Sequence, residues 1–167
     1  IRSCLVGSEM CIRDRGRRLV LHRTKEPNAG MHSPVGGKLE VEDGESPHTC
    51  AVREVHEETG ILLEKDEVHL LGMVSERAYE NTNHWLIFVY EATRTIDPNE
   101  ITSMVMDEGE LKWVRDEDIE HIGIPDTDRE ILWPQVKAHT PGGFFVVHIE
   151  CGGDTLVPTL LQSHLAS

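Results

Sequence analysis

Three carboxylates, those of Glu54, Glu57 and Glu58, fall within five residues of one another near the end of a segment with helical character. At about 100° per residue they share one sector of about 100° of the helix surface. Like charges at this spacing repel, and negative charge at the C-terminal end of a helix opposes the helix dipole. The pattern is typical either of a solvated acidic face or of a site for a hard cation such as Mg²⁺, which prefers carboxylate oxygens.

The helix that carries these glutamates has clear end signals. Ser46 is a favourable N-cap residue, Pro47 suits the first helical position, and Gly60 can adopt the left-handed conformation that ends a helix. We therefore predict a helix over residues 47–59. The side chains on its neighbouring face, which can pack against a core, are those of Ala51, Val52, Val55 and Thr59.

The wider spacing resembles a known signature. Gly37 is followed after seven residues by Glu45, and after seven more by the run 53–61, which reads REVHEETGI. This is similar to the motif of the Nudix hydrolases, Gx5Ex7REUxEExGU with U an apolar residue, and it matches throughout from Glu45 onward. Because the family usually has a shorter spacing after the glycine, we interpret LEVED as a loop that is two residues longer.

The Nudix resemblance implies an α/β fold, an α/β/α sandwich with a mixed β-sheet, and hydrolysis of a nucleoside diphosphate linked to another group. It implies a Mg²⁺ cofactor, with Mn²⁺ as the alternative, to neutralise the pyrophosphate and activate water. Arg53 and Glu45 match a structural pair in which the arginine orients the glutamates. The metal ligands that the resemblance implies are the carbonyl of Gly36 and the carboxylates of Glu54, Glu57 and Glu58.

A further glutamate is expected from outside the helix. The segment DEGELKWV resembles the stretch by which MutT-like Nudix enzymes supply one; Glu110 is best placed in it, with Asp107 and Glu108 as alternatives. The competing interpretation is a solvated loop glutamate. Glu110 is a candidate metal ligand, and Glu58 and Glu110 are the two candidates for the carboxylate that accepts the proton of the attacking water.

Candidate substrate contacts come from other segments. IPDTDREILWP resembles an acidic loop beside the base pocket of oxidised-purine nucleoside triphosphatases, in which Asp126 and Asp128 would accept hydrogen bonds from a purine. Helix capping is the competing role for the two aspartates. Lys38 and Arg23 are cations near the glutamates that can contact phosphates. Trp85 either faces the cleft or packs in the core, and we favour the core.

Residues 5–15, which read LVGSEMCIRDR, resemble one reading frame of a transposase sequencing adapter. We therefore divide the chain into residues 1–15, a non-native segment excluded from the fold, and residues 16–167, the Nudix domain. Because a Nudix domain has a strand just before GRRLVLHR, we expect this chain to lack its first strand.

The chain of 167 residues has 16 basic and 30 acidic residues, which gives a formal net charge of −14. A single domain of this size can bury a core. Such acidity argues against a nucleic-acid polymer or an anionic membrane as partner, whereas a nucleotide can bind when metals screen its phosphates. No signal peptide, membrane-spanning run or disulfide pattern is recognisable, so we expect a cytoplasmic protein, as a monomer or homodimer.

The remaining pattern alternates strands with short helices. We predict strands in RRLVLHRTK, EVHLLGMVSE, HWLIFVYEATR and ELKWV, and a last strand in GGFFVVHIEC. EPNAGMHSPVGGK is predicted to be a loop, RDEDIEHI a short helix, and PDTDREILWPQVKAH a helix broken or kinked at Pro134.

The preferred function is that of a Mg²⁺-dependent pyrophosphohydrolase that cleaves a purine nucleoside triphosphate, such as 8-oxo-dGTP, to the monophosphate and pyrophosphate. The same chemistry on ADP-ribose or a nucleotide sugar is the first alternative. A non-catalytic, nucleotide-binding Nudix module is the second, and the retained glutamates disfavour it.

Overall fold

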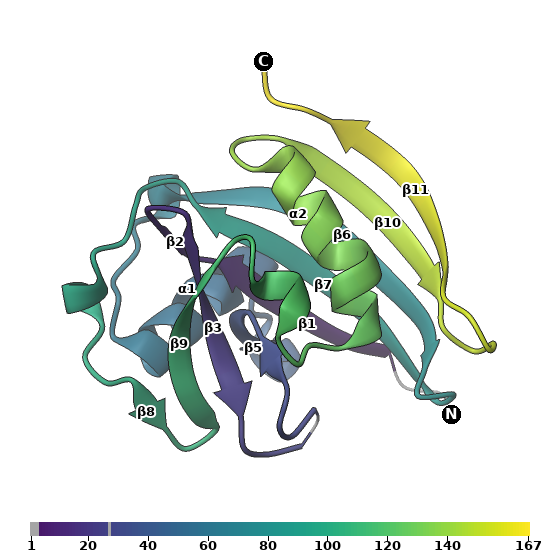
Figure 1. Ribbon diagram of the computed structural model, residues 1–167, viewed down its shortest axis with the longest axis horizontal. Coiled ribbons are helices and arrows are strands. Elements are labelled where there is room, and N and C mark those ends of the chain that lie inside the picture. The colour runs from purple at the N-terminus through teal and green to yellow at the C-terminus, as the bar shows by residue number, and fades with distance from the viewer. Residues whose placement is uncertain (1–3, 27) are drawn as a thin grey trace.

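The computed structural model describes residues 4–26 and 28–167 and has the predicted mixed α/β architecture (Figure 1). The larger sheet contains, in spatial order, β11 (Val157–His164), β10 (Phe144–Glu150), β6 (Val68–Tyr79), β7 (Asn83–Ala92), β1 (Cys4–Cys11) and β5 (Val35–Lys38). It is mixed, because β1 and β7 run parallel, as do β10 and β6, whereas the other neighbours are antiparallel.

A smaller antiparallel sheet lies beside the larger one. It contains β2 (Arg13–Asp14), β3 (Arg17–Arg23), β9 (Gly109–Arg115) and β8 (Val105–Met106), and β4 (His32–Ser33) pairs with β3. This sheet brings the β8–β9 turn next to the end of β3, where the backbone N–H of Thr24 donates to the carbonyl of Glu108 at 2.9 Å. The turn therefore lies close to the segment that leads into β5.

Two core clusters form on opposite faces of the larger sheet. Along the end of β1 the side chains alternate, so that Met10 and Ile12 join one cluster and Cys11 joins the other. The first cluster also contains Ala51 and Val55 of α1 (Pro47–Thr59), and the second contains Trp133 and Val136 of α2 (Trp133–His139). One helix thus covers each face, as the sandwich architecture requires (Figure 1). Among the described residues, none of the helices has the length and apolar character needed to cross a membrane.

Several segment predictions need correction. The stretch 26–38 is not all loop, because it contains β4 and β5. The helix predicted at 115–122 is only a 3-10 turn at Ile119–His121. The helix predicted at 125–139 passes through a π-helical turn at Asp128–Leu132 and continues as α2, so the irregularity expected at Pro134 takes the form of a π-helical turn just before it. GGFFVVHIEC contains β10, but the last strand is β11.

The prediction that the chain lacks a first strand is wrong. Residues 4–11 form β1, which pairs with β7 on one side and β5 on the other. Met10, Cys11 and Ile12 are buried at 2% exposure or less, so this segment belongs to the core rather than outside the fold. The similarity of residues 5–15 to a sequencing adapter is a matter of origin, and it stays a prediction.

Candidate active site

The glutamate helix α1 has the predicted bounds and the predicted caps. The side chain of Ser46 accepts a hydrogen bond from the backbone N–H of Thr49 at 3.1 Å, and Pro47 occupies the first turn. Gly60 is left-handed, with φ 79°, and its N–H donates to the carbonyl of His56 at 2.8 Å. Because Val55 and Ala51 anchor the neighbouring face of α1 in the core, the glutamate face is held toward β5.

Arg53 connects the acidic side chains of this region. Its Nε and Nη2 donate to the two carboxylate oxygens of Glu45 at 2.7 and 3.0 Å, and its Nη1 donates to Glu54 at 2.8 Å and to Glu57 at 3.2 Å. This bidentate pairing holds the pKa of Glu45 below its usual value. The geometry agrees with the structural role that the family resemblance implies for Arg53.

The glycines of β5 lie directly against α1. The backbone N–H of Gly36 donates to Oε2 of Glu58 at 3.2 Å. A side chain at position 37 would overlap the carboxylate of Glu54, and one at position 36 would overlap the carbonyl of Ser8. Position 36 therefore requires glycine because of close approach to backbone, whereas a side chain at position 37 would displace the flexible Glu54 carboxylate. The extra loop residues form a 3-10 turn at 41–43, which leaves this contact intact.

The carboxylates of the helix are electrostatically strained. Burial, followed by repulsion from Glu54, raises the pKa of Glu58 to about 8. Burial also raises the pKa of Glu54, although hydrogen bonds from Arg53 oppose the change. Glu108 adds further repulsion to both groups. Oxygen ligands that repel one another at a partly desolvated position fit a hard divalent cation, which would remove the repulsion.

The side chains are not arranged as a finished metal site. Among the described residues, no three His, Cys, Asp or Glu side chains already converge as metal ligands. Arg53 bonds both Glu54 and Glu57, and the side chain of Glu57 is 56% exposed. A metal held by all three helix glutamates would require Glu57 to exchange its ion pair with Arg53 for a position beside Glu54 and Glu58.

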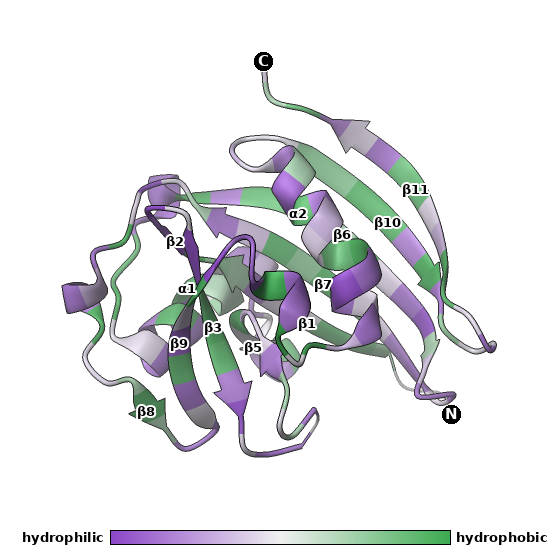
Figure 2. Ribbon diagram, in the orientation of Figure 1, coloured by the Kyte–Doolittle hydropathy of each residue, from purple (hydrophilic) through white to green (hydrophobic). Residues whose placement is uncertain are grey.

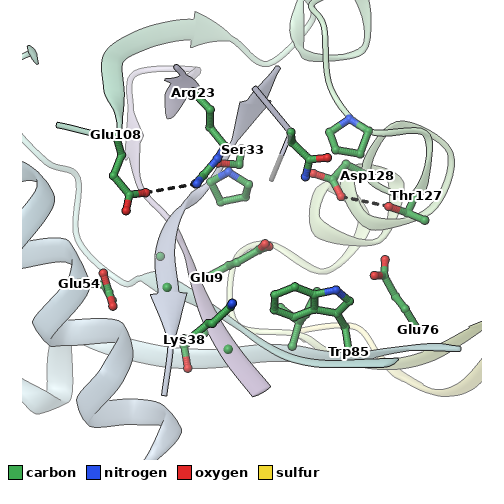
Figure 3. A pocket seen from close by; sticks show the side chains of 18 of the residues that line it. Glu9, Arg23, Ser33, Lys38, Glu54, Glu76, Trp85, Glu108, Thr127 and Asp128 are labelled. Atoms are coloured by element: carbon green, nitrogen blue, oxygen red, sulfur yellow. Dashed lines mark hydrogen bonds and ion pairs between the residues drawn. The ribbon is translucent and has the colours of Figure 1, made fainter. Parts of the chain in front are cut away.

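A cavity of about 470 Å³ lies in front of Glu54 and extends away from α1 (Figure 3). This volume is in the range of small-molecule sites. Near Glu54 it is lined by Gly36, Gly37, Lys38 and the Arg23–Glu108 ion pair, whose atoms are 3.3 Å apart. The end near α1 thus combines carboxylates, cationic side chains and exposed backbone, which suits phosphate groups and their counter-ion.

The far end of the cavity is aromatic and acidic. Trp85, Glu76, Thr127 and Asp128 line it, and Lys38 lies between the two ends with its Nζ 5.7 Å from the centre of the Trp85 ring (Figure 3). Burial, followed for Asp128 by repulsion from Glu76, raises the pKa of each of these two carboxyl groups to about 7. This end can therefore stack a planar group and accept hydrogen bonds from it.

Six of the predicted site residues line this cavity: Arg23, Gly36, Lys38, Arg53, Glu54 and Asp128. Glu58 contacts Gly36 behind the lining, and Glu57 points outward with its ion pair to Arg53. The structure does not bring the other two predicted residues, Glu110 and Asp126, to the cavity.

Glu110 and Asp126 are engaged elsewhere. The carboxylate of Glu110 is half exposed on β9 and lies 3.7 Å from Nζ of Lys112, whereas its neighbour Glu108, one of the alternatives, lines the cavity. Asp126 is 73% exposed and forms an ion pair with Arg129 at 2.9 Å, a local contact within the turn. This contact is structural, but it is an ion pair rather than the helix capping named as the competing role.

Four residues that line the cavity were missed by sequence reasoning: Asn28, Glu76, Tyr79 and Thr127. Trp85 was expected in the core, but it also lines the cavity. Glu76 is 7% exposed in the structure, but in the sequence it only ends a predicted strand, between Ser75 and Arg77, and gave no clear signal. For Asn28 and Tyr79, whose side chains bond each other at 3.2 Å, no local pattern indicates a site.

Comparisons with known proteins also indicate a Nudix hydrolase. A family model described as the NUDIX domain matches residues 8–144. The MutT protein of Bacillus halodurans superposes with a TM-score of 0.72 at 22% identity, covering 94% of this chain and 97% of that one. The MutT NUDIX hydrolase of Burkholderia pseudomallei has 28% identity and a TM-score of 0.56, covering 80% and 98%. The NUDIX domain of Shewanella oneidensis NrtR, in complex with ADP ribose, has 16% identity and a TM-score of 0.67, covering 82% and 88%.

The matched range includes the glycines of β5, the whole of α1 and the turn that carries Glu108. It also begins inside β1, so the family match includes part of the first strand. With the helix glutamates, their arginine and the facing glycines in one arrangement, the chain belongs to the Nudix family and is a MutT-like hydrolase of phosphoric anhydride bonds.

Proposed function

We propose that this enzyme is a Mg²⁺-dependent pyrophosphohydrolase that cleaves a purine nucleoside triphosphate to the monophosphate and pyrophosphate. The observation that carries the proposal is the two-ended cavity. One end has carboxylates and cations beside α1, and the other has an aromatic ring with two buried carboxyl groups. An elongated ligand with phosphates at one end and a hydrogen-bonding planar base at the other matches this polarity.

The metal would be held at the α1 end by Glu54, Glu58 and the carbonyl of Gly36, with Glu57 joining after it leaves Arg53. Glu108 is a better candidate than Glu110 for the glutamate from outside the helix, because it lines the cavity and faces Glu54 and Glu58. When bound, a divalent ion supplies charge neutralisation of the pyrophosphate and a more acidic water.

The chain's own groups have separate tasks. Lys38 and Arg23 neutralise phosphate oxygens, Lys38 from the junction of the two ends and Arg23 from beside Glu108. Glu58 is the preferred proton acceptor, because its carboxylate lies against Gly36, beside the carbonyl that would hold the metal. Its Oε2 is kept in position by the N–H of Gly36.

The base would lie against Trp85, with Asp128 and Glu76 accepting from its N–H groups. Guanine presents its N1–H and its 2-amino group on one edge, and 8-oxoguanine adds an N–H at N7. The acidic lining therefore favours donor-rich bases and supports 8-oxo-dGTP as the substrate to test first.

ADP-ribose is the second candidate substrate. The NrtR domain that shares this fold is in complex with ADP ribose, and Lys38, which lies between the two ends of the cavity, would also suit a diphosphate held there. NrtR also has a structure with DNA, so a regulatory module is the third candidate. The net charge of −14 opposes an extended phosphate backbone, and the complete glutamate set favours catalysis.

The test measures pyrophosphate release from 8-oxo-dGTP, dGTP and dATP with Mg²⁺, and AMP release from ADP-ribose, at substrate concentrations below KM. Glu58→Gln should lower kcat on the order of 100-fold or more. The matched control is Glu117→Gln, because the side chain of Glu117 is 71% exposed and outside the cavity. Pyrophosphate from none of the triphosphates, together with turnover of ADP-ribose, would refute the proposal and favour the second candidate.

A further inference from the structure

The strand β11 forms the outer edge of the larger sheet (Figure 1). Among the described strands it pairs only with β10, in an antiparallel register from Phe144 opposite His164 to Glu150 opposite Val157. All eight of its residues are exposed. The N–H and C=O groups along its other edge are therefore available to a further strand.

Apolar side chains are concentrated at this edge. Of the nine large hydrophobic residues exposed in the described part of the chain, four lie within nine consecutive positions: Val157, Leu160, Leu161 and Leu165. The other five are scattered over residues 31–105. Isolated exposed apolar residues are ordinary, whereas a contiguous group of them marks an interaction surface.

The register shows that one of these side chains continues the core. Leu160 lies opposite Val147, and Pro158 lies opposite Ile149, so both share the face on which Val147 and Ile149 are buried. Val147 and Ile149 belong to the cluster covered by α2. Apolar residues are present on both strands (Figure 2). The apolar face of the sheet that α2 covers therefore extends beyond α2 to Leu160, which is 50% exposed.

Charge indicates which partner fits. The chain has a net charge of −14, so two copies repel one another over most approaches. Residues 155–167, which read TLVPTLLQSHLAS, contain no Asp, Glu, Lys or Arg. This edge is where two identical copies can meet without placing like charges opposite each other.

We propose that β11 is the self-association surface, and that two copies join by antiparallel pairing of β11 with β11 about a two-fold axis perpendicular to the sheet. This symmetry makes the contact self-complementary and joins the two six-stranded sheets into one. It leaves α2 of both copies on the same face, so the two Leu160 side chains fill the space between them. Because Pro158 lacks an N–H, the pairing spans residues 159–163 and centres on Leu161, the residue at which the β10–β11 register shifts.

The test is sedimentation equilibrium of the wild type, Leu161→Lys and Leu62→Lys over a range of protein concentrations. Leu62 is the matched control, since it is 70% exposed and Leu161 is 63% exposed, but it lies outside the edge. We expect the wild type to dimerise and Leu161→Lys to raise the dimer dissociation constant at least tenfold, with an unchanged thermal midpoint of unfolding for the monomer. Leu62→Lys should dimerise as the wild type does.

A monomeric wild type at all concentrations would overturn the proposal, as would a Leu161→Lys variant that dimerises normally. An equal loss for Leu62→Lys would show a general charge effect instead. A second measurement tests the geometry: in a Cys4→Ser, Cys151→Ser background, mild oxidation should link Leu161→Cys but not Leu62→Cys into a disulfide-bonded dimer. A dimer that forms no such bond at position 161 would refute the antiparallel register. None of these readouts depends on the substrate.

Discussion

Replacing Glu76 by glutamine should stabilise the fold at neutral and alkaline pH. Glu76 lies on β6 with 7% exposure, and burial raises the pKa of its carboxyl group from 4.5 to about 7, against an opposing hydrogen bond from Thr127. A carboxyl group with a higher pKa in the folded state binds its proton more tightly when the protein is folded. It therefore favours folding below the unfolded pKa, and this contribution is lost as the pH rises through the folded pKa.

The size of the effect follows from the shift. A change from 4.5 to about 7 corresponds to roughly 3 kcal/mol in the free energy of unfolding, at about 1.4 kcal/mol per pKa unit. The wild type should lose this amount between about pH 4.5 and pH 8, in addition to what its other groups contribute. Glutamine carries no charge at any of these pH values. Because Glu76 also raises the pKa of Asp128, its removal relieves a second group in the same direction.

Urea denaturation at pH 5, 6, 7 and 8 measures the difference directly. The free energies of unfolding of Glu76→Gln and the wild type should be similar at pH 5 and should diverge by about 2–3 kcal/mol in favour of the variant at pH 8. Glu117→Gln, an exposed site, should follow the wild type throughout. A pH profile of Glu76→Gln that parallels the wild type, with equal m-values, would show that burial of this carboxylate does not destabilise the fold.

Three further substitutions test the glutamate end of the cavity. Arg53→Lys should lower the free energy of unfolding by about 2 kcal/mol in urea denaturation, because lysine cannot replace its hydrogen bonds to Glu45 and Glu54; an unchanged midpoint would contradict this. Gly37→Ala should displace the Glu54 carboxylate and weaken Mg²⁺ or Mn²⁺ binding about tenfold, as measured by calorimetry. Stability should change little because the Glu54 side chain can move, and a metal affinity equal to that of the wild type would refute the contact. Glu108→Gln should lower kcat at least about tenfold and Glu110→Gln no more than about twofold; the reverse order would restore Glu110 to the site.

The parts of the site that local sequence determines were predictable. Helix α1 begins and ends at the predicted residues, because Ser46, Pro47 and Gly60 act within a few positions of themselves. The arginine and glutamates of the signature also meet as expected, since they are neighbours on one helix turn or one loop away. Such contacts depend on helix periodicity and capping rather than on distant packing.

The far end of the cavity depends on long-range register, which no local pattern encodes. Glu108 and Glu110 are the two neighbours of Gly109 in the sequence, and local sequence does not show which of them faces the cavity. Any side chain at position 109 would overlap the carbonyl of His22. That close approach fixes the turn so that Glu108 faces Arg23 and Glu110 faces away. Trp85 likewise lies opposite Glu76 across β6 and β7, and only this pairing brings the two side chains to the same cavity. The strand β11 escaped prediction because its exposed residues carry no alternation between core and solvent.

Strand β1 lies inside the larger sheet, between β7 and β5, and such a strand mainly needs side chains that suit both faces of the sheet. The end of β1 satisfies both faces through Met10, Cys11 and Ile12, which alternate between the two core clusters. Glu9 does not follow this pattern. In the described part of the chain its Oε2 is buried without a hydrogen-bond partner. Burial, followed by repulsion from Asp128 and Glu76, raises the pKa of its carboxyl group. A carboxylate without a counter-charge is costly there. Glu9 also lines the cavity, so this cost falls at the candidate site (Figure 3).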